Sequence, residues 1–184
     1  MKKKLFAGIV FALLLLSIYQ SMADDGYENE GFGDDFGKGL GSLAIVMLVL
    51  GGGYVILRRG YVLAKKLNLT ENEEYGDLIK TTYKSLRGPM MIAHLITNIL
   101  ATIFGALHGL SMHEYTRLTY YSGWIAVLAM VVLSVSGLFI YFKFKPFWKF
   151  RESRTFIRFL HRQWMITGIL AISILLHLAV AEDD

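Results

Sequence analysis

The stretch MIAHLITNILATIFGALHGL, residues 91–110, contains two histidines, His94 and His108, and no lysine, arginine or acidic residue. About 20 mainly apolar residues in an α-helix are enough to cross the hydrocarbon core of a bilayer. The chain has three further stretches of this kind, which brings the predicted spans to residues 41–57, 89–110, 122–142 and 164–181. The sequence therefore predicts an all-α fold, a four-helix transmembrane bundle over residues 41–181.

The composition agrees with a membrane protein. Of the 184 residues, 54% are hydrophobic and only 18% are charged, and the mean hydropathy is +0.46. The net charge of +4 does not indicate nucleic-acid binding, because the basic residues gather in two loops whose position has a simpler explanation in membrane topology. The chain has no cysteine, which excludes disulfides, covalently attached haem and iron–sulfur ligation by its own side chains.

The N-terminus predicts a secretory signal peptide over residues 1–23. Three lysines precede an apolar run, and Ser21-Met22-Ala23 forms a small-x-small cleavage site. The alternative is an uncleaved first anchor helix. Residues 24–40 are predicted to be an acidic, glycine-rich, flexible extracytoplasmic tail, and residues 182–184 a short acidic C-terminal tail.

Charge predicts the orientation. The loops 58–88 and 143–163 hold seven lysines and arginines each, whereas the connection between the second and third spans holds only Arg117. The positive-inside rule then places both basic loops in the cytoplasm and both mature termini outside. We expect a multi-pass protein of the cell (plasma) membrane.

Four of the five histidines lie within or at the rim of two spans. His94 and His108 are in the second span, and His161 and His177 are at the start and near the end of the fourth. An imidazole inside a membrane is costly and usually functional. Because the second and fourth spans run in the same direction, His94 and His161 share the cytoplasmic level, and His108 and His177 share the outer level. The fifth histidine, His113, is predicted to be a solvated loop residue.

Helical phase favours the outer level. His94 and His108 are 14 residues apart, which is about 40° short of whole turns, so both rings are expected on one face. His161 and His177 are 16 residues apart and about 160° out of phase. Either the helix bends or winds differently near His161, or His161 is not a ligand.

Glycines occur with the same spacing as the histidines. Gly123 and Gly137 in the third span are 14 residues apart, as are Gly39 and Gly53 near the first span. A glycine lets the backbone approach a flat group closely. The alternative is ordinary packing between membrane helices, which also enriches small residues.

This pattern resembles the dihaem b-type membrane cytochromes, namely cytochrome b of the quinol–cytochrome c oxidoreductases and the ferric-reductase-like membrane domains. Those families carry histidines 13 or 14 residues apart on each of two helices, and the 16-residue spacing here departs from that. The resemblance implies two haem b groups, or one at the outer site. It implies axial ligands to the haem iron at His94, His108, His161 and His177, and close approach of the cofactor at Gly123 and Gly137.

The expected function is to carry electrons across the membrane, between a quinol or cytoplasmic-side donor and an extracytoplasmic redox protein such as a cytochrome c. A quinone or another membrane electron carrier, and membrane lipid, are the other predicted partners. No catalytic residue is predicted, and the chain would act as an electron-transfer protein or as a subunit of a membrane oxidoreductase. Candidates for pairing with haem propionates are Arg162 and Arg158 inside and Arg117 outside.

Two other functions remain open. The chain could be a non-redox membrane anchor or assembly subunit whose histidines serve packing. A small transporter is less favoured, because the spans hold no Asp, Glu, Lys or Arg.

Overall fold

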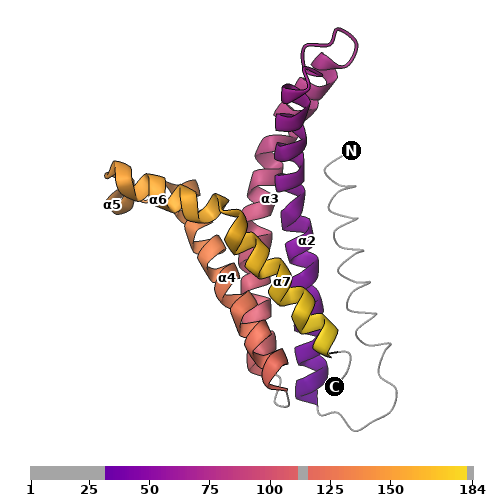
Figure 1. Cartoon of the computed structure of the whole chain (residues 1–184), viewed down its shortest axis with the longest axis vertical. Coiled ribbons are helices and arrows are strands. Elements are labelled where there is room, and N and C mark those ends of the chain that lie inside the picture. Colours follow the sequence, from indigo (N-terminus) through magenta and orange to yellow (C-terminus); the bar gives the residue numbers. More distant parts are fainter. Residues whose placement is uncertain (1–31, 112–115, 182–184) are drawn as a thin grey trace.

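The computed structural model describes residues 32–111 and 116–181 (Figure 1). The predicted signal peptide, residues 24–31 of the predicted tail, His113 and the C-terminal residues 182–184 lie outside this described part. The described part is all-α, as predicted. Its elements are α2 (Phe32–Lys66), α3 (Gly76–Ser111), α4 (Arg117–Phe142), α5 (Lys145–Trp148), α6 (Arg151–Arg162) and α7 (Trp164–Ala181).

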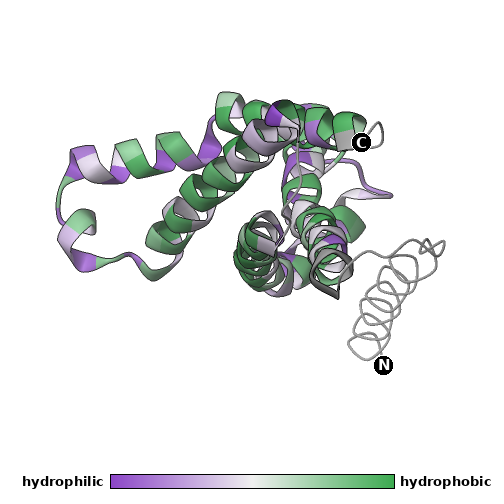
Figure 2. Cartoon of the chain, turned by 90° about the horizontal axis from the view of Figure 1, so that it is seen from below, coloured by the Kyte–Doolittle hydropathy of each residue, from purple (hydrophilic) through white to green (hydrophobic). Residues whose placement is uncertain are grey.

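Four helical segments are long and apolar enough to cross a membrane, which is the architecture of a multi-pass membrane protein. They are Phe36–Lys66, Gly76–Ser111, Arg117–Phe142 and the α6–α7 segment Arg151–Val180. In Figure 2 hydrophobic positions predominate along the long helices, and large apolar side chains on their surfaces are exposed. Such a surface is stable in contact with lipid chains rather than with water.

The bundle consists of two halves. The hairpin of α2 and α3 forms one half, α4 packs along α7 in the other, and α3 and α4 join them (Figure 1). A small core lies where all four helices meet. Met47 from α2, Ala101 from α3 and Met130 from α4 are buried together, and Leu170 from α7 packs against them. This core lies between the levels of the two predicted histidine pairs, so it keeps α3 and α7 in a defined relation at both levels.

The first predicted basic loop, residues 58–88, is mostly helical. α2 continues to Lys66 and α3 begins at Gly76, so only residues 67–75 connect them. The rings of Tyr61 and Tyr83 stack with centroids 3.8 Å apart and hold the extended hairpin together. The helices extend beyond the predicted spans because hydropathy reports where the lipid ends, whereas a helix continues as long as its backbone bonds are favourable.

The start of the first span is also earlier than predicted. α2 begins at Phe32, so residues 32–40 belong to a helix and not to a flexible tail. Packing explains the difference, because Leu40 is buried and the backbone of Gly37 hydrogen-bonds a side chain of α3. Composition alone predicted a tail because it does not register such tertiary contacts.

The second predicted basic loop, residues 143–163, is folded into two short helices. Lys143 ends α4 in the left-handed conformation, at φ 48° and ψ 49°, and turns the chain sharply. The ring of Phe139 in α4 then packs on Phe144 and Phe147, with centroids 5.8 and 5.2 Å away. As a result α5 and α6 extend sideways from the end of the bundle before α7 returns along α4 (Figure 1).

Candidate functional site: two cross-helix histidine pairs

The structure brings all four predicted histidines together in pairs. The rings of His94 on α3 and His161 on α6 have centroids 6.2 Å apart and planes 78° apart. The rings of His108 on α3 and His177 on α7 have centroids 5.8 Å apart and planes 89° apart. We call these the inner pair and the outer pair. The prediction that His94 and His108 share one face of their helix is confirmed.

A break in the fourth span explains how His161 reaches the inner pair. α6 ends at Arg162, Gln163 adopts an extended backbone with φ −77° and ψ 124°, and α7 begins at Trp164. His161 and His177 therefore belong to two different helices, and the phase difference of about 160° for one straight helix does not apply. Of the two alternatives left open by the sequence, the structure shows a change of direction near His161.

Each of the four imidazoles is oriented by a hydrogen bond from Nδ1 to a backbone carbonyl. The acceptors and Nδ1–O distances are Gly51 at 2.8 Å for His94, Gly37 at 2.8 Å for His108, Leu133 at 3.0 Å for His161 and Thr119 at 3.0 Å for His177. A carbonyl oxygen only accepts, so Nδ1 carries the proton. Within the described residues no group hydrogen-bonds any Nε2 atom. Nε2 is thus the free lone pair in all four rings, as in metal-bound histidines whose other nitrogen is held by a carbonyl.

Glycines on neighbouring helices make room for three of the rings. A Cβ atom at Gly137 would lie 3.0 Å from Cε1 of His161, and one at Gly123 would lie 3.2 Å from Cε1 of His177. In α2 a Cβ at Gly41 would lie 3.1 Å from Cε1 of His108. Gly123 and Gly137 were predicted to matter, and they do lie at the two histidine levels, although what they contact is the histidine rings themselves.

The glycines of the first helix differ from those predicted. A Cβ at Gly53 would meet Met90, not a histidine, whereas Gly51 supplies the carbonyl that holds His94. Gly41 lies against the His108 ring. The spacing of 14 identified the helix but not the correct positions, because the register between α2 and α3 is set by packing along the whole hairpin.

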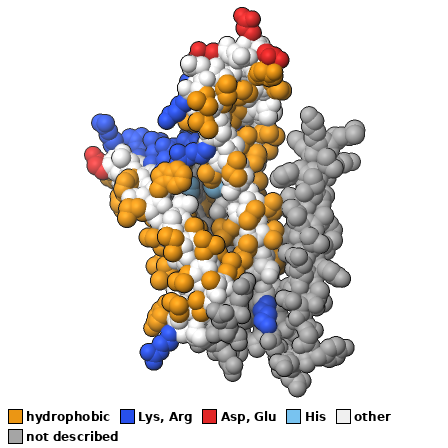
Figure 3. Space-filling model, turned by 45° about the vertical axis from the view of Figure 1, so that its right-hand side comes forward, with side chains coloured by type: hydrophobic (Ala, Val, Ile, Leu, Met, Phe, Trp, Pro, Cys, Tyr) orange, Lys and Arg blue, Asp and Glu red, His pale blue; other side chains and the backbone are white. Residues whose placement is uncertain are grey.

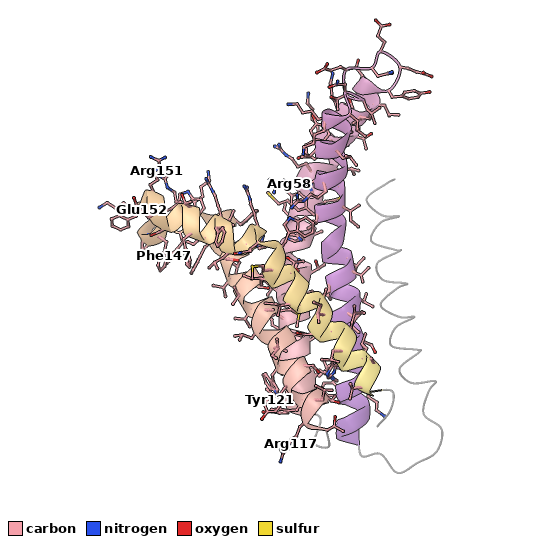
Figure 4. The ribbon with its side chains drawn as sticks, in the orientation of Figure 1. Arg58, Arg117, Tyr121, Phe147, Arg151 and Glu152 are labelled. Carbon is pink, nitrogen blue, oxygen red and sulfur yellow. The ribbon has the colours of Figure 1, made fainter. Side chains whose placement is uncertain are left out.

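Arginines surround the inner pair. Arg162 interacts electrostatically with Arg58, Arg158 and Arg59, and both Arg162 and Arg58 act on His161. No aspartate or glutamate of the described residues is ion-paired with any of these four arginines. In Figure 3 a band of basic side chains lies directly above a hollow in which histidine is visible, and Figure 4 shows Arg58 on the side of α2 and α3 that faces α6.

The sequence predicted Arg158 and Arg162 near this site but missed Arg58 and Arg59. It also missed Tyr54, whose ring centroid lies 5.4 Å from that of His94. The signal was present, since Arg58 lies four residues after Tyr54 and seven after Gly51, which places all three on one side of α2. In the sequence alone, the loop position of Arg58 and Arg59 indicates only the membrane topology.

At the outer level the sequence predicted one arginine, Arg117. Arg117, predicted to serve this site, is exposed in the first turn of α4. In Figure 4 its side chain points away from the bundle. The structure therefore does not bring Arg117 to the outer pair. Helix geometry explains the miss, because a residue at the first turn of α4 has no backbone constraint that turns it toward α3 and α7.

The donor set suits one kind of metal group. In the part of the chain that the structure describes, no three His, Cys, Asp or Glu side chains gather around a common point. Two imidazoles from different helices could serve a metal whose remaining ligands come from a planar macrocycle. Two imidazoles bound by Nε2 to opposite sides of one metal ion would have centroids about 6 Å apart. Both pairs are close to this spacing.

Comparison of the chain with protein-family models, with curated proteins and with solved structures finds no match. A functional assignment therefore depends on the geometry of the chain's own residues.

Proposed function

We propose that the chain is an integral membrane b-type cytochrome that carries electrons across the membrane. Two haem b groups would be bound, one by His94 and His161 and one by His108 and His177. Electrons would pass between a quinol or cytoplasmic-side donor and an extracytoplasmic redox partner such as a cytochrome c. The protein would lie in the cell membrane with both mature termini outside, as the distribution of basic residues favours.

One observation carries this proposal. At each of two levels, two imidazoles from different helices have ring centroids at about the separation that a shared iron requires, and each has its Nδ1 held by a carbonyl. Oriented Nε2 lone pairs are what axial ligation needs.

The chain's other residues have matching roles. When bound, haem supplies one-electron chemistry at iron. The four carbonyls orient the rings, Gly41, Gly123 and Gly137 leave space for them, and the inner arginines would neutralise propionate carboxylates. His94 and His108 are about 21 Å apart along the axis of α3, which is a large part of the ~30 Å thickness of the hydrocarbon core. Two redox groups at these levels would leave only short gaps to either membrane face.

The mid-span polar residues do not favour a transporter. The hydroxyls of Thr102 and Ser134 hydrogen-bond each other at 2.9 Å between α3 and α4. Ser134 also donates to the carbonyl of Asn98 at 3.3 Å. These groups therefore join helices and do not line a polar pathway.

The test is a dithionite-reduced minus oxidised spectrum of the detergent-purified protein, with haem quantified per chain as the pyridine haemochrome. The protein should be produced in cells supplied with haem. Two b haems per chain are expected. A colourless protein that is nevertheless folded and monodisperse would refute the proposal and favour a membrane anchor or assembly subunit. A single haem would refute the two-site form and restrict the function to one level.

A further inference from the structure

The helices α5 and α6 form an unusual element at the arginine-rich end of the bundle. They leave the end of α4 sideways and run across the direction of the spans (Figure 1). α6 packs against α4, and α5 packs against α6. The guanidinium of Arg158 in α6 lies 5.3 Å from the ring centroid of Trp148 in α5, a cation–π contact that joins the two helices. This element is therefore a fixed part of the fold and not a free loop.

One face of α6 is a row of arginines. Arg151, Arg154, Arg158 and Arg162 follow one another at intervals of three and four residues, which places them on one side of the helix. The single acidic residue of α6 is Glu152, in its first turn. In Figure 4 the side chain of Arg151 points away from the spans, and Figure 3 shows the basic band along this end of the molecule.

Away from the arginine row, α6 exposes large aromatic side chains. Phe156, on the side opposite the row, is 60% exposed, and Phe159, on its flank, is 57% exposed, whereas Ile157 is buried. Three further exposed phenylalanines, Phe144, Phe147 and Phe150, extend this surface over α5 and its flanks. Figure 4 shows Phe147 on the side of the element that faces the level of the spans, opposite to Arg151.

We propose that α5 and α6 form an interfacial element that binds anionic phospholipid headgroups. The outer half of the arginine row, Arg151 and Arg154, would contact the phosphates, while Phe156 and Phe159 would enter the boundary between headgroups and acyl chains. A cationic amphipathic helix with bulky apolar residues on its other face has the composition of a helix that lies in the membrane surface. Its position between two membrane spans holds it at that surface without any further binding energy.

Charge and depth together select lipid as the occupant. The phenylalanines lie on the side of the spans, where lipid chains are the surrounding medium, and the arginines lie on the side of water and phosphate. A cytoplasmic protein would contact the arginine row but would leave the phenylalanines unexplained. A second copy of the chain would cover the phenylalanines but would bring two rows of arginines together, which is unfavourable without anions. This proposal does not depend on haem binding.

The first test measures retained lipid. The full chain is reconstituted in nanodiscs of phosphatidylcholine and phosphatidylglycerol, and the lipids that stay bound are counted by native mass spectrometry. The double variant Arg151→Gln/Arg154→Gln should lose affinity for phosphatidylglycerol by roughly fivefold for each removed charge. The matched control Lys65→Gln/Lys66→Gln removes the same charge from the exposed end of α2 and should retain the lipid. Equal retention by both variants, or equal loss by both, would overturn the proposal.

The second test uses single-residue variants and so does not depend on that double variant being stable. The chain has no cysteine, so Phe156→Cys and Arg151→Cys each provide a single site for a nitroxide label. In vesicles containing phosphatidylglycerol, the label at position 156 should be relaxed by oxygen and the label at 151 by an aqueous nickel complex. A label at 156 that the nickel complex reaches would mean a helix facing water. A label at 156 that neither reagent reaches would mean a protein-covered face, and either result would overturn the proposal.

Discussion

The inner and outer histidine pairs have nearly the same ring geometry in different surroundings. Their centroid separations are 6.2 and 5.8 Å, and their ring planes are 78° and 89° apart. The outer pair joins two long spans, α3 and α7. The inner pair joins α3 to the short α6, where Arg162 and Arg58 act electrostatically on His161. The comparison indicates that ring geometry and the electrostatic environment depend on different residues, so that each can be changed alone.

The largest expected effect comes from removing a ring at one level. His108→Ala should abolish the outer haem and leave the inner one, and His94→Ala should do the reverse. Each variant should retain one haem per chain in the pyridine haemochrome assay, because the two pairs share no ligand. His113→Ala serves as the control, since that histidine belongs to neither pair, and it should retain both haems. Full haem content in His108→Ala and His94→Ala would rule out axial ligation by these residues.

A less severe change is to crowd one ring. In Gly137→Val the added side chain would collide with His161, because a Cβ alone would already lie 3.0 Å from Cε1 of that ring. Overpacking of this kind costs about 1–3 kcal/mol, so we expect a weakened inner site and an unchanged outer site. Gly123→Val should produce the opposite pattern through His177.

The matched control for both is Gly168→Val in α7, where an added Cβ meets nothing within 4 Å. Haem titration of the three variants measures the haem affinity of the inner and outer sites in each. If Gly168→Val weakens either site as much as the other two do, the effect reflects general disturbance of the bundle and not contact with a ring.

The arginines should give the inner and outer haems different midpoint potentials. Positive charge near a haem favours the reduced form, which carries one positive charge fewer. Arg58→Gln and Arg162→Gln should therefore lower the midpoint potential of the inner haem, on the order of tens of millivolts each. The outer haem should not shift. Potentiometric titration of the α-band checks this, with Arg117→Gln as the control. Equal shifts at both levels would show that the arginines act through net charge and not through proximity.

The smallest effect is expected from the polar contact between the levels. Thr102→Val removes the hydrogen bond to Ser134 and should reduce the free energy of unfolding by about 0.6 kcal/mol, the average for such bonds in membrane proteins. Both haems should remain. Chemical denaturation in detergent measures the stability, and the reduced minus oxidised spectrum measures the haem. Loss of one haem only would indicate that this contact supports a single level.

Much of this arrangement could be predicted from the sequence, for physical reasons that differ between elements. The spans are visible because burial in lipid requires long apolar runs, and the depth of each histidine follows from its place along a span. His94 and His108 lie on the same face of α3 because the helix between them is continuous. In contrast, the backbone at Gln163 leaves the helical region without a proline or glycine to indicate it, so the phase of His161 could not be predicted.

The contacts between helices could not be predicted either. The offset between two helices along their axes decides which α2 glycine contacts His108 and which α2 arginine lies near Arg162. A single sequence contains no record of that offset. The predicted spacing of 14 thus identified Gly123 and Gly137, which lie against their rings from α4, whereas Gly53 lies against Met90 and not against a histidine. Arg58 is an intermediate case: its position on one side of α2 with Tyr54 and Gly51 follows from the sequence, but its nearness to Arg162 depends on where α6 lies.

The extended residue Gln163 has a consequence for how proteins of this design could be found. The number of residues between two histidines predicts whether they lie on the same face of a helix, but only if the helix between them is unbroken. One non-helical residue resets the phase, after which an interval of 16 can present two rings to one neighbouring helix as well as an interval of 14 does. Searches that require a constant interval will pass over such chains. A rule that scores the membrane depth of each histidine, and tolerates a break between them, would retain them.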